Sequence, residues 1–163
     1  MTPLDPVLIR ELILRLGAAT LAGGVLGLNR ELHGKAAGLR THALVALGSA
    51  VVTTIALHPE TIGNTVDPNA LSRIIQGTLT GIGFIGAGVI LRDTAGHVSG
   101  LTTAATVWVC AGLGIVCGLG YWHVLSIAFV LVLLVLLTGK PIERLAEKLF
   151  RHRPSEHVNH HDA

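Results

Sequence analysis

From Val98 to Gly139 the chain contains no Asp, Glu, Lys or Arg. As one α-helix this stretch would be roughly 60 Å long, about twice the thickness of the hydrocarbon core of a bilayer. We therefore expect it to fold back on itself and to form two membrane-spanning helices, at residues 101–119 and 121–138.

The turn between these two helices is predicted in the segment 118–123. Gly120 interrupts a helix, and the next two residues, Tyr121 and Trp122, are of the aromatic types that favour the membrane–water interface.

Only 13% of the 163 residues are charged, against about 25% in a typical soluble domain. Charged residues divide the preceding part of the chain into three more apolar runs, at residues 12–28, 41–58 and 71–91. Each is close to the ~20 residues that cross a bilayer as a helix. The sequence therefore predicts an all-α polytopic membrane protein with five transmembrane helices in residues 1–139.

The distribution of basic residues between the expected loops predicts the orientation. The loop at residues 58–70 contains Glu60 and Asp67 but no Lys or Arg. Because cytoplasmic loops are enriched in Lys and Arg, we expect the N-terminus outside and the C-terminus in the cytoplasm. The basic residues on the cytoplasmic side would be Arg30, Lys35, Arg40, Arg92, Lys140, Arg144, Lys148, Arg151 and Arg153.

Three arginines, Arg10, Arg15 and Arg73, depart from this pattern, since they lie near the outer ends of the expected helices. We expect them to extend to the lipid headgroups or to pair with carboxylates such as Glu11.

Residues 140–163 are expected to form a cytoplasmic tail. The stretch Pro141–His152 is basic and amphipathic, which is typical of a helix on the inner leaflet and also of a short soluble helix. Residues 154–163 are expected to be disordered. The histidines of the tail do not follow the spacing of a defined metal site, so the sequence assigns no metal; they are His152, His157, His160 and His161.

Helix ends and cysteines allow further predictions. Asp67 followed by Pro68 predicts the N-terminal cap of the third helix, and Ser99 is a candidate cap for the fourth. Cys110 and Cys117 are about 10 Å apart by helical rise, which is too far for a disulfide within one helix. We expect two buried, unreactive thiols.

The third run contains many glycines. The letters Gly81 to Gly88 match a dinucleotide-binding pattern, but the pattern lies inside an apolar span with no strand before it, so we exclude a nucleotide site. The alternative is helix packing, because glycine lets a neighbouring backbone approach closely in lipid. The packing candidates are Gly77, Gly81, Gly83, Gly86 and Gly88, and the fourth helix has a similar set in Gly112, Gly114 and Gly118.

Many polar residues are concentrated in the cytoplasmic loop at residues 29–42. One interpretation is an ordinary basic loop that sets topology. The other is a functional rim in which Glu31, Arg40, Thr41 and His42 point into the bundle and Glu31 pairs with Arg40. Asp93, Thr102 and Thr103 would emerge on the same side.

Five blocks of the sequence are similar to blocks of a known family, and they are Gly27–Glu31, Ala37–His42, Leu47–Ala50, Gly81–Gly88 and Gly100–Trp108. With these blocks the chain resembles the MgtC/SapB family of bacterial inner-membrane proteins. Asn29 stands where that family usually has Glu, Ile85 where it usually has Leu, and about 25 residues follow the last expected span, where many members have an ACT-like domain.

The resemblance implies a five-helix inner-membrane protein linked to magnesium homeostasis. For some members it also implies survival inside host cells and damping of the proton-driven ATP synthase. The functional residues that it implies here are Glu31, Arg40, Thr41, His42, Arg73, Thr102, Thr103, Trp108 and the glycines of the third helix.

Two classes of function follow. The first is a non-enzymatic regulator that contacts another membrane protein, such as the membrane part of the ATP synthase. The second is a Mg²⁺ transporter. Mg²⁺ prefers oxygen ligands, usually with one or two carboxylates, and the 10 acidic residues all lie outside the centres of the expected spans. A transport site would then need an oligomer with rings of carboxylates at the rims. We therefore favour the regulator, with the lipid bilayer as its environment and no nucleic-acid partner or cofactor.

Overall fold

The structure, a computed structural model, describes residues 5–57, 69–92 and 98–150. It is almost entirely α-helical, with one short antiparallel pair of strands that aligns Leu91 with Ser99 and Arg92 with Val98. The elements are α1 (Pro6–Leu32), α2 (Leu39–Leu57), α3 (Ala70–Val89), β1 (Leu91–Arg92), β2 (Val98–Ser99), α4 (Leu101–Leu119) and α5 (Trp122–Phe150).

Within these residues, four helices are long and apolar enough to cross a membrane, namely α1, α2, α4 and the part Trp122–Gly139 of α5. The predicted all-α membrane fold is therefore confirmed. The predicted fifth span, α3, has 20 residues but is not among these four, and it contains the polar residues Arg73 and Gln76. Because α3 lies beside α2 and α4, we still expect it to cross the same layer.

The helix ends differ from the expected spans in a systematic way. The ends of α4 coincide with the predicted 101–119, while α1 begins six residues before the predicted 12–28 and ends four residues after it. Hydropathy marks the part of a helix inside the lipid, whereas the backbone hydrogen bonds continue beyond it. The predicted span 71–91 was too long at its C-terminal end, because Leu91 begins β1.

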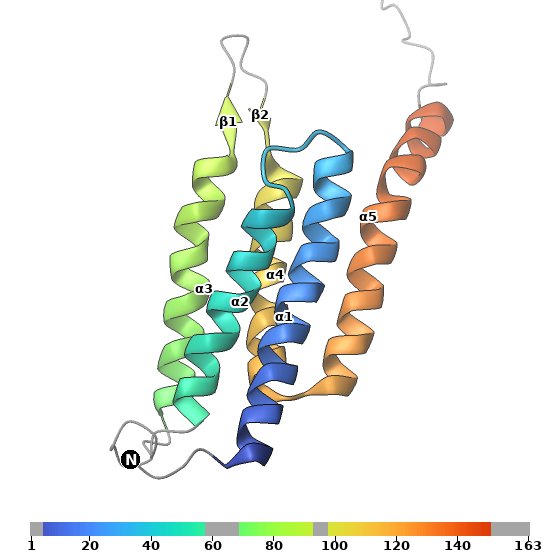
Figure 1. Cartoon of the computed structure of the whole chain (residues 1–163). Helices are drawn as coiled ribbons and strands as arrows, with labels where there is room; N and C mark the ends of the chain where they lie inside the picture. The colour runs from blue at the N-terminus through green and yellow to red at the C-terminus, as the bar shows by residue number, and fades with distance from the viewer. Residues whose placement is uncertain (1–4, 58–68, 93–97, 151–163) are drawn as a thin grey trace, which may run out of the picture. The chain divides into compact units, whose positions relative to one another are not determined.

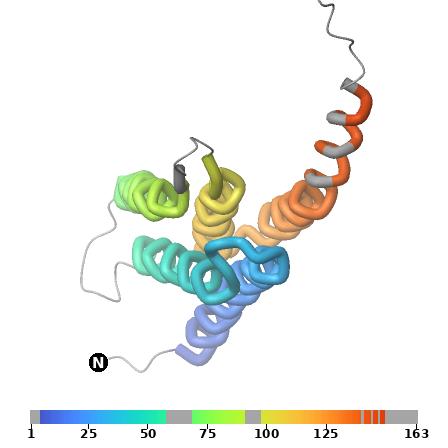
Figure 2. The backbone as a smooth tube through the Cα atoms, turned by 90° about the horizontal axis from the view of Figure 1, so that it is seen from above, coloured from blue at the N-terminus to red at the C-terminus, as the bar shows by residue number. Residues whose placement is uncertain are grey.

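The chain divides into two compact units, Met1–Phe129 and Val130–Ala163. In the first unit, successive helices α1 to α4 run in opposite directions (Figure 1). Helix α4 packs against α1, α2 and α3, and Figure 2 shows these helices end-on. One cluster of the core consists of small residues, which are Ala19, Ala46, Ala50, Cys110 and Cys117.

Close approach of backbones holds α1, α2 and α4 together. A Cβ atom on Gly23 of α1 would lie only 2.5 Å from the carbonyl oxygen of His42. One on Gly118 of α4 would lie 2.8 Å from the carbonyl oxygen of Ala50, and one on Gly114 would overlap the Ala46 carbonyl. In lipid, where no hydrophobic effect drives helices together, small residues at the contacts allow the close van der Waals packing that stabilises association.

The predicted turn after α4 is confirmed. Gly120 ends the helix in the left-handed conformation, with φ of 74°. Next to this turn Arg15 donates a hydrogen bond of 2.9 Å from Nη1 to the carbonyl oxygen of Gly118. The same guanidinium forms the predicted ion pair with Glu11, at 2.9 Å. Arg15 therefore ties α1 to the C-terminal end of α4.

One predicted cap is wrong and another lies outside the described residues. Gly100, not Ser99, precedes α4, and its φ of 89° is a conformation that strains residues with a Cβ atom. Ser99 belongs to β2. Asp67 and Pro68 lie outside the described part of the chain, and Asn69 precedes α3 without a side-chain cap.

In the second unit, α5 continues through Pro141 to Phe150. The expected amphipathic stretch is thus the end of a longer helix, up to residue 150. Its apolar residues Ile142, Leu145 and Leu149 are exposed. Its position on the inner leaflet remains a prediction, and residues 151–163 lie outside the described part.

Candidate functional site

A buried network of polar groups lies near the end of the bundle where α1 stops and where α2 and α4 begin (Figure 1). We call this end the hairpin end, since β1 and β2 also lie there. At its centre is His42, which is fully buried on α2. Its Nδ1 is 2.9 Å from the carbonyl oxygen of Gly38, and its Nε2 is 3.2 Å from Oγ1 of Thr106 on α4.

The partners of His42 determine its tautomer. A carbonyl oxygen only accepts, so the Nδ1 nitrogen must bear the hydrogen, and in a neutral ring Nε2 is then an acceptor. The Thr106 hydroxyl also lies 2.8 Å from the carbonyl oxygen of Thr103. Its single hydrogen therefore has two acceptors, the Thr103 carbonyl oxygen and the His42 ring.

Arg30 extends this network from α1. Its side chain is only 6% exposed, and Nη2 donates a hydrogen bond of 2.8 Å to Oγ1 of Thr103. The Nε–H group is buried and has no hydrogen-bond partner. No carboxylate of the described residues forms an ion pair with this guanidinium.

Arg30 was not among the predicted site residues, because the first expected span ended at Leu28 and Arg30 was placed in a loop. The structure continues α1 to Leu32, so Arg30 keeps the helical register of the packed face. The sequence did contain a signal for the burial of Arg30. Small and apolar residues precede it at intervals of three and four, which places them and Arg30 on one helical face. The buried residues of that face are Ala19, Ala22, Gly23, Leu26, Gly27 and Arg30.

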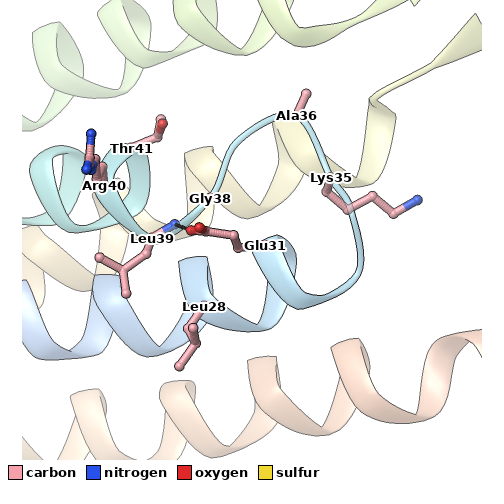
Figure 3. A pocket seen from close by; sticks show the side chains of 8 residues that line it. All are labelled: Leu28, Glu31, Lys35, Ala36, Gly38, Leu39, Arg40 and Thr41. Atoms are coloured by element: carbon pink, nitrogen blue, oxygen red, sulfur yellow. Dashed lines mark hydrogen bonds between the residues drawn. The ribbon is translucent and has the colours of Figure 1, made fainter.

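Glu31 has a different role from the one expected. Its Oε2 accepts a hydrogen bond of 2.9 Å from the backbone N–H of Leu39, the first residue of α2. Figure 3 shows the Arg40 side chain directed away from this carboxylate. The structure therefore does not contain the expected Glu31–Arg40 ion pair. Glu31 instead satisfies a backbone donor at the start of a helix, where such donors have no partner within the helix.

Glu31, Arg40 and Thr41 lie together on an open pocket of about 440 Å³ (Figure 3). The pocket is at the hairpin end, between the last turn of α1 and the first turn of α2. Its lining residues are Leu28, Glu31, Lys35, Ala36, Gly38, Leu39, Arg40 and Thr41.

Of the predicted site residues, His42 and Thr103 belong to the buried network, and the others that the structure describes do not. Arg73 on α3 and Thr102 and Trp108 on α4 are exposed. Asp93 lies outside the described residues. Thr106 and Cys110 were not selected from the sequence, although the thiol of Cys110 lies 3.1 Å from the carbonyl oxygen of His42.

The glycines of α3 were expected to form a packed seam, and within this chain they do not. A Cβ atom on Gly77, Gly81, Gly83 or Gly88 would meet no atom within 4 Å. Only Gly86 lies against a neighbour, since its Cβ would be 3.6 Å from that of Ala104. The close contacts are instead those of Gly23, Gly114 and Gly118, because α4 and not α3 is the central helix.

An open groove of about 440 Å³ lies between α2 and α3. Gly77 and Gly81 form part of one wall, and Gly48 forms part of the other. The remaining lining residues are Leu44, Val45, Ser49, Val52, Thr78, Ile82 and Ile85.

The described residues contain no group of three or more His, Cys, Asp or Glu side chains that could hold a metal ion. The tail histidines and Asp93 lie outside them. Cys110 and Cys117 are free and buried, as predicted.

Comparison with known proteins identifies the family of the chain. The sequence model of the MgtC family matches residues 16–145, a range that includes Arg30, His42, Thr103 and Thr106. No solved structure matches the chain.

Three curated relatives illustrate the similarity. Protein SrpB of Synechococcus elongatus is 45% identical over 81% of this chain and 76% of its own length. Protein SapB of Bacillus subtilis is 40% identical over 75% of this chain and 54% of its own length. Protein MgtC of Salmonella typhimurium is 42% identical over 79% of this chain and 52% of its own length, so the matches cover only about half of these last two proteins. From the family match and these identities, the chain belongs to the MgtC family.

Proposed function

We propose that the chain is a non-enzymatic regulator of another protein in the bacterial inner membrane, linked to magnesium homeostasis. The partner we favour is the membrane part of the ATP synthase. The link to magnesium rests on the family, since a relative from Escherichia coli, 42% identical over 77% of this chain, is named a putative magnesium transporter.

The observation that supports regulation by contact is the groove between α2 and α3. Four glycines of α3 have open space where a Cβ atom would be, and two of them line the groove together with Gly48 of α2. Glycines inside a transmembrane helix allow a second helix to approach closely, which stabilises association in lipid. A transmembrane helix of the partner would occupy this groove.

The test uses liposomes that contain purified ATP synthase with or without the chain. An imposed proton gradient drives ATP synthesis, and its rate is measured. We expect the parent chain to lower the rate and Gly81→Leu to have a much weaker effect, because the added side chain fills the groove. Gly24→Leu on α1 is the matched control, since a Cβ there also meets nothing within 4 Å. Equal inhibition by the parent and Gly81→Leu would contradict the groove as the contact site.

The second candidate is a Mg²⁺ transporter that works as a homo-oligomer, and the printed name of the Escherichia coli relative favours it. Liposomes that contain the chain alone and a Mg²⁺-sensitive dye separate the two functions. Uptake of Mg²⁺ that depends on the chain would overturn the proposal that the chain is a regulator. We expect no uptake above that of empty liposomes.

A further inference from the structure

Two sources of positive potential meet at the beginning of α4. The first is the N-terminal end of this 19-residue helix, where the helix dipole and the unpaired backbone N–H groups favour negative charge. Gly100 at the cap position provides no side-chain acceptor for these N–H groups. The second is the buried guanidinium of Arg30, which contacts the first turn of α4 through Thr103.

The last turn of α1, which contains Arg30, carries the partial negative charge of a helix C-terminus, but no carboxylate among the described residues pairs with the guanidinium. Arg30 forms no ion pair there, and its Nε–H has no acceptor. Glu31 is adjacent in sequence, but its carboxylate binds the Leu39 N–H at the start of α2. His42, on the other side of Thr106, contributes no negative charge in either protonation state. A buried charge without a partner is strongly unfavourable, so such groups persist when they bind a counter-ion or serve a function.

We propose that the beginning of α4 is a binding site for a phosphate-type oxyanion. The Nε–H of Arg30 would donate to one of its oxygens. Thr103 accepts from Nη2 of Arg30 through Oγ1, so its own hydroxyl hydrogen remains available for a second oxygen. The backbone N–H groups of the first turn would complete the site, as they do at other anion sites on helix N-termini.

The oxyanion has two sources, free inorganic phosphate and the phosphodiester of an anionic lipid headgroup. The hairpin end lies at an end of the membrane-spanning helices (Figure 1), where free anions and lipid headgroups are both present. Arg30 and Thr103 are themselves buried, so the first turn of α4 would have to move to admit the oxyanion. The site does not depend on which protein the chain regulates, and its test needs no partner.

The test measures the thermal unfolding midpoint of the purified full chain in nanodiscs. In phosphatidylcholine nanodiscs, inorganic phosphate replaces chloride at constant ionic strength. In a second series, phosphatidylglycerol replaces part of the phosphatidylcholine. Ligands that bind only the folded state raise the midpoint in a saturable manner.

The decisive variant is Arg30→Gln, with Arg10→Gln as matched control, because Arg10 is an exposed arginine of the same helix. We expect the parent and Arg10→Gln to be stabilised by one of the two probes. In Arg30→Gln we expect the affinity for that probe to fall at least tenfold. Stabilisation by phosphate identifies a free anion, and stabilisation by phosphatidylglycerol alone identifies a lipid headgroup.

If Arg30→Gln does not fold, Thr103→Val and Arg30→Lys replace it. The first removes a hydroxyl donor and the second keeps the charge but loses the Nε–H, so each should weaken binding severalfold. Equal responses of all variants to both probes, or no response of the parent to either, would overturn the proposal. If the parent responds to neither probe, the unfolding midpoint of Asp93→Asn is measured as well. A loss of stability equal to that of Arg30→Gln would then identify Asp93 as the counter-charge of Arg30.

Discussion

Nη2 of Arg30 donates a hydrogen bond of 2.8 Å to Oγ1 of Thr103, across a sequence separation of 73 residues. The bond joins the last turn of α1 to the first turn of α4. Thr106, one turn further along α4, continues the connection to His42 on α2. The three helices with the closest backbone contacts thus also share one polar network at the hairpin end.

The Thr106 hydroxyl is expected to be needed for stability. Thr106→Val keeps the shape but leaves Nε2 of the buried His42 without a partner, which costs about 1–3 kcal/mol of unfolding free energy. Thr102→Val is the control, because Thr102 lies in the same helix and is exposed. Unfolding by denaturant in detergent micelles measures both, and equal stabilities would show that the His42–Thr106 contact contributes nothing.

Gly114 and Gly81 should respond in opposite ways to the same substitution. Gly114→Leu introduces a side chain where the Ala46 carbonyl already lies, so the helices must separate, at a cost of about 1–3 kcal/mol or more. Gly81→Leu adds a side chain in open space and should leave the folded monomer intact. The yield of folded protein after detergent extraction measures the difference, and loss of Gly81→Leu with retention of Gly114→Leu would reverse our assignment of the packed helix.

Glu31 is expected to act as a cap and Arg40 to be structurally neutral. Glu31→Ala removes the acceptor for the Leu39 N–H and should cost about 1 kcal/mol, whereas Glu31→Gln retains an oxygen that accepts the same bond. Arg40→Lys should not change stability, since Arg40 does not pair with Glu31. Thermal unfolding of the three variants tests this, and a large loss in Arg40→Lys would indicate a contact of its guanidinium that the structure does not contain.

The orientation that the loop charges predict can be tested by thiol labelling. A cysteine introduced at Asn64 should react with an impermeant reagent in intact cells, and one introduced at Lys35 only after permeabilisation. The natural cysteines, Cys110 and Cys117, should not react with the reagent, because both are buried. The reverse pattern of labelling would refute an outside N-terminus.

A large part of the fold was predictable from the sequence. The apolar runs located every helix of the described residues, because a charged group inside the lipid is costly and marks where a span stops. No charged residue lies at either end of α4, and there the turn after residue 118 set the C-terminal limit. Gly120 located the turn before α5. The Arg15–Glu11 pair was predictable too, since residues four apart on a helix are neighbours.

The candidate site was predicted only in part. His42 and Thr103 were selected and do lie in the buried network, but Arg30 was assigned to a loop and Glu31 was given the wrong partner. Hydropathy reports how deep a residue lies along the membrane normal and not which face of its helix meets a neighbour. The roles of Arg30 and Glu31 depend on the second kind of information.

The sequence by itself determined that this chain crosses a membrane as helices, where they lie and where they turn, because these properties depend on local composition. The tertiary structure decided which glycines are packed and which are open. It also decided that Arg30 turns inward to Thr103, while Glu31 caps α2. These outcomes depend on the relative rotation and spacing of α1, α2 and α4, which contacts between residues far apart in the sequence determine.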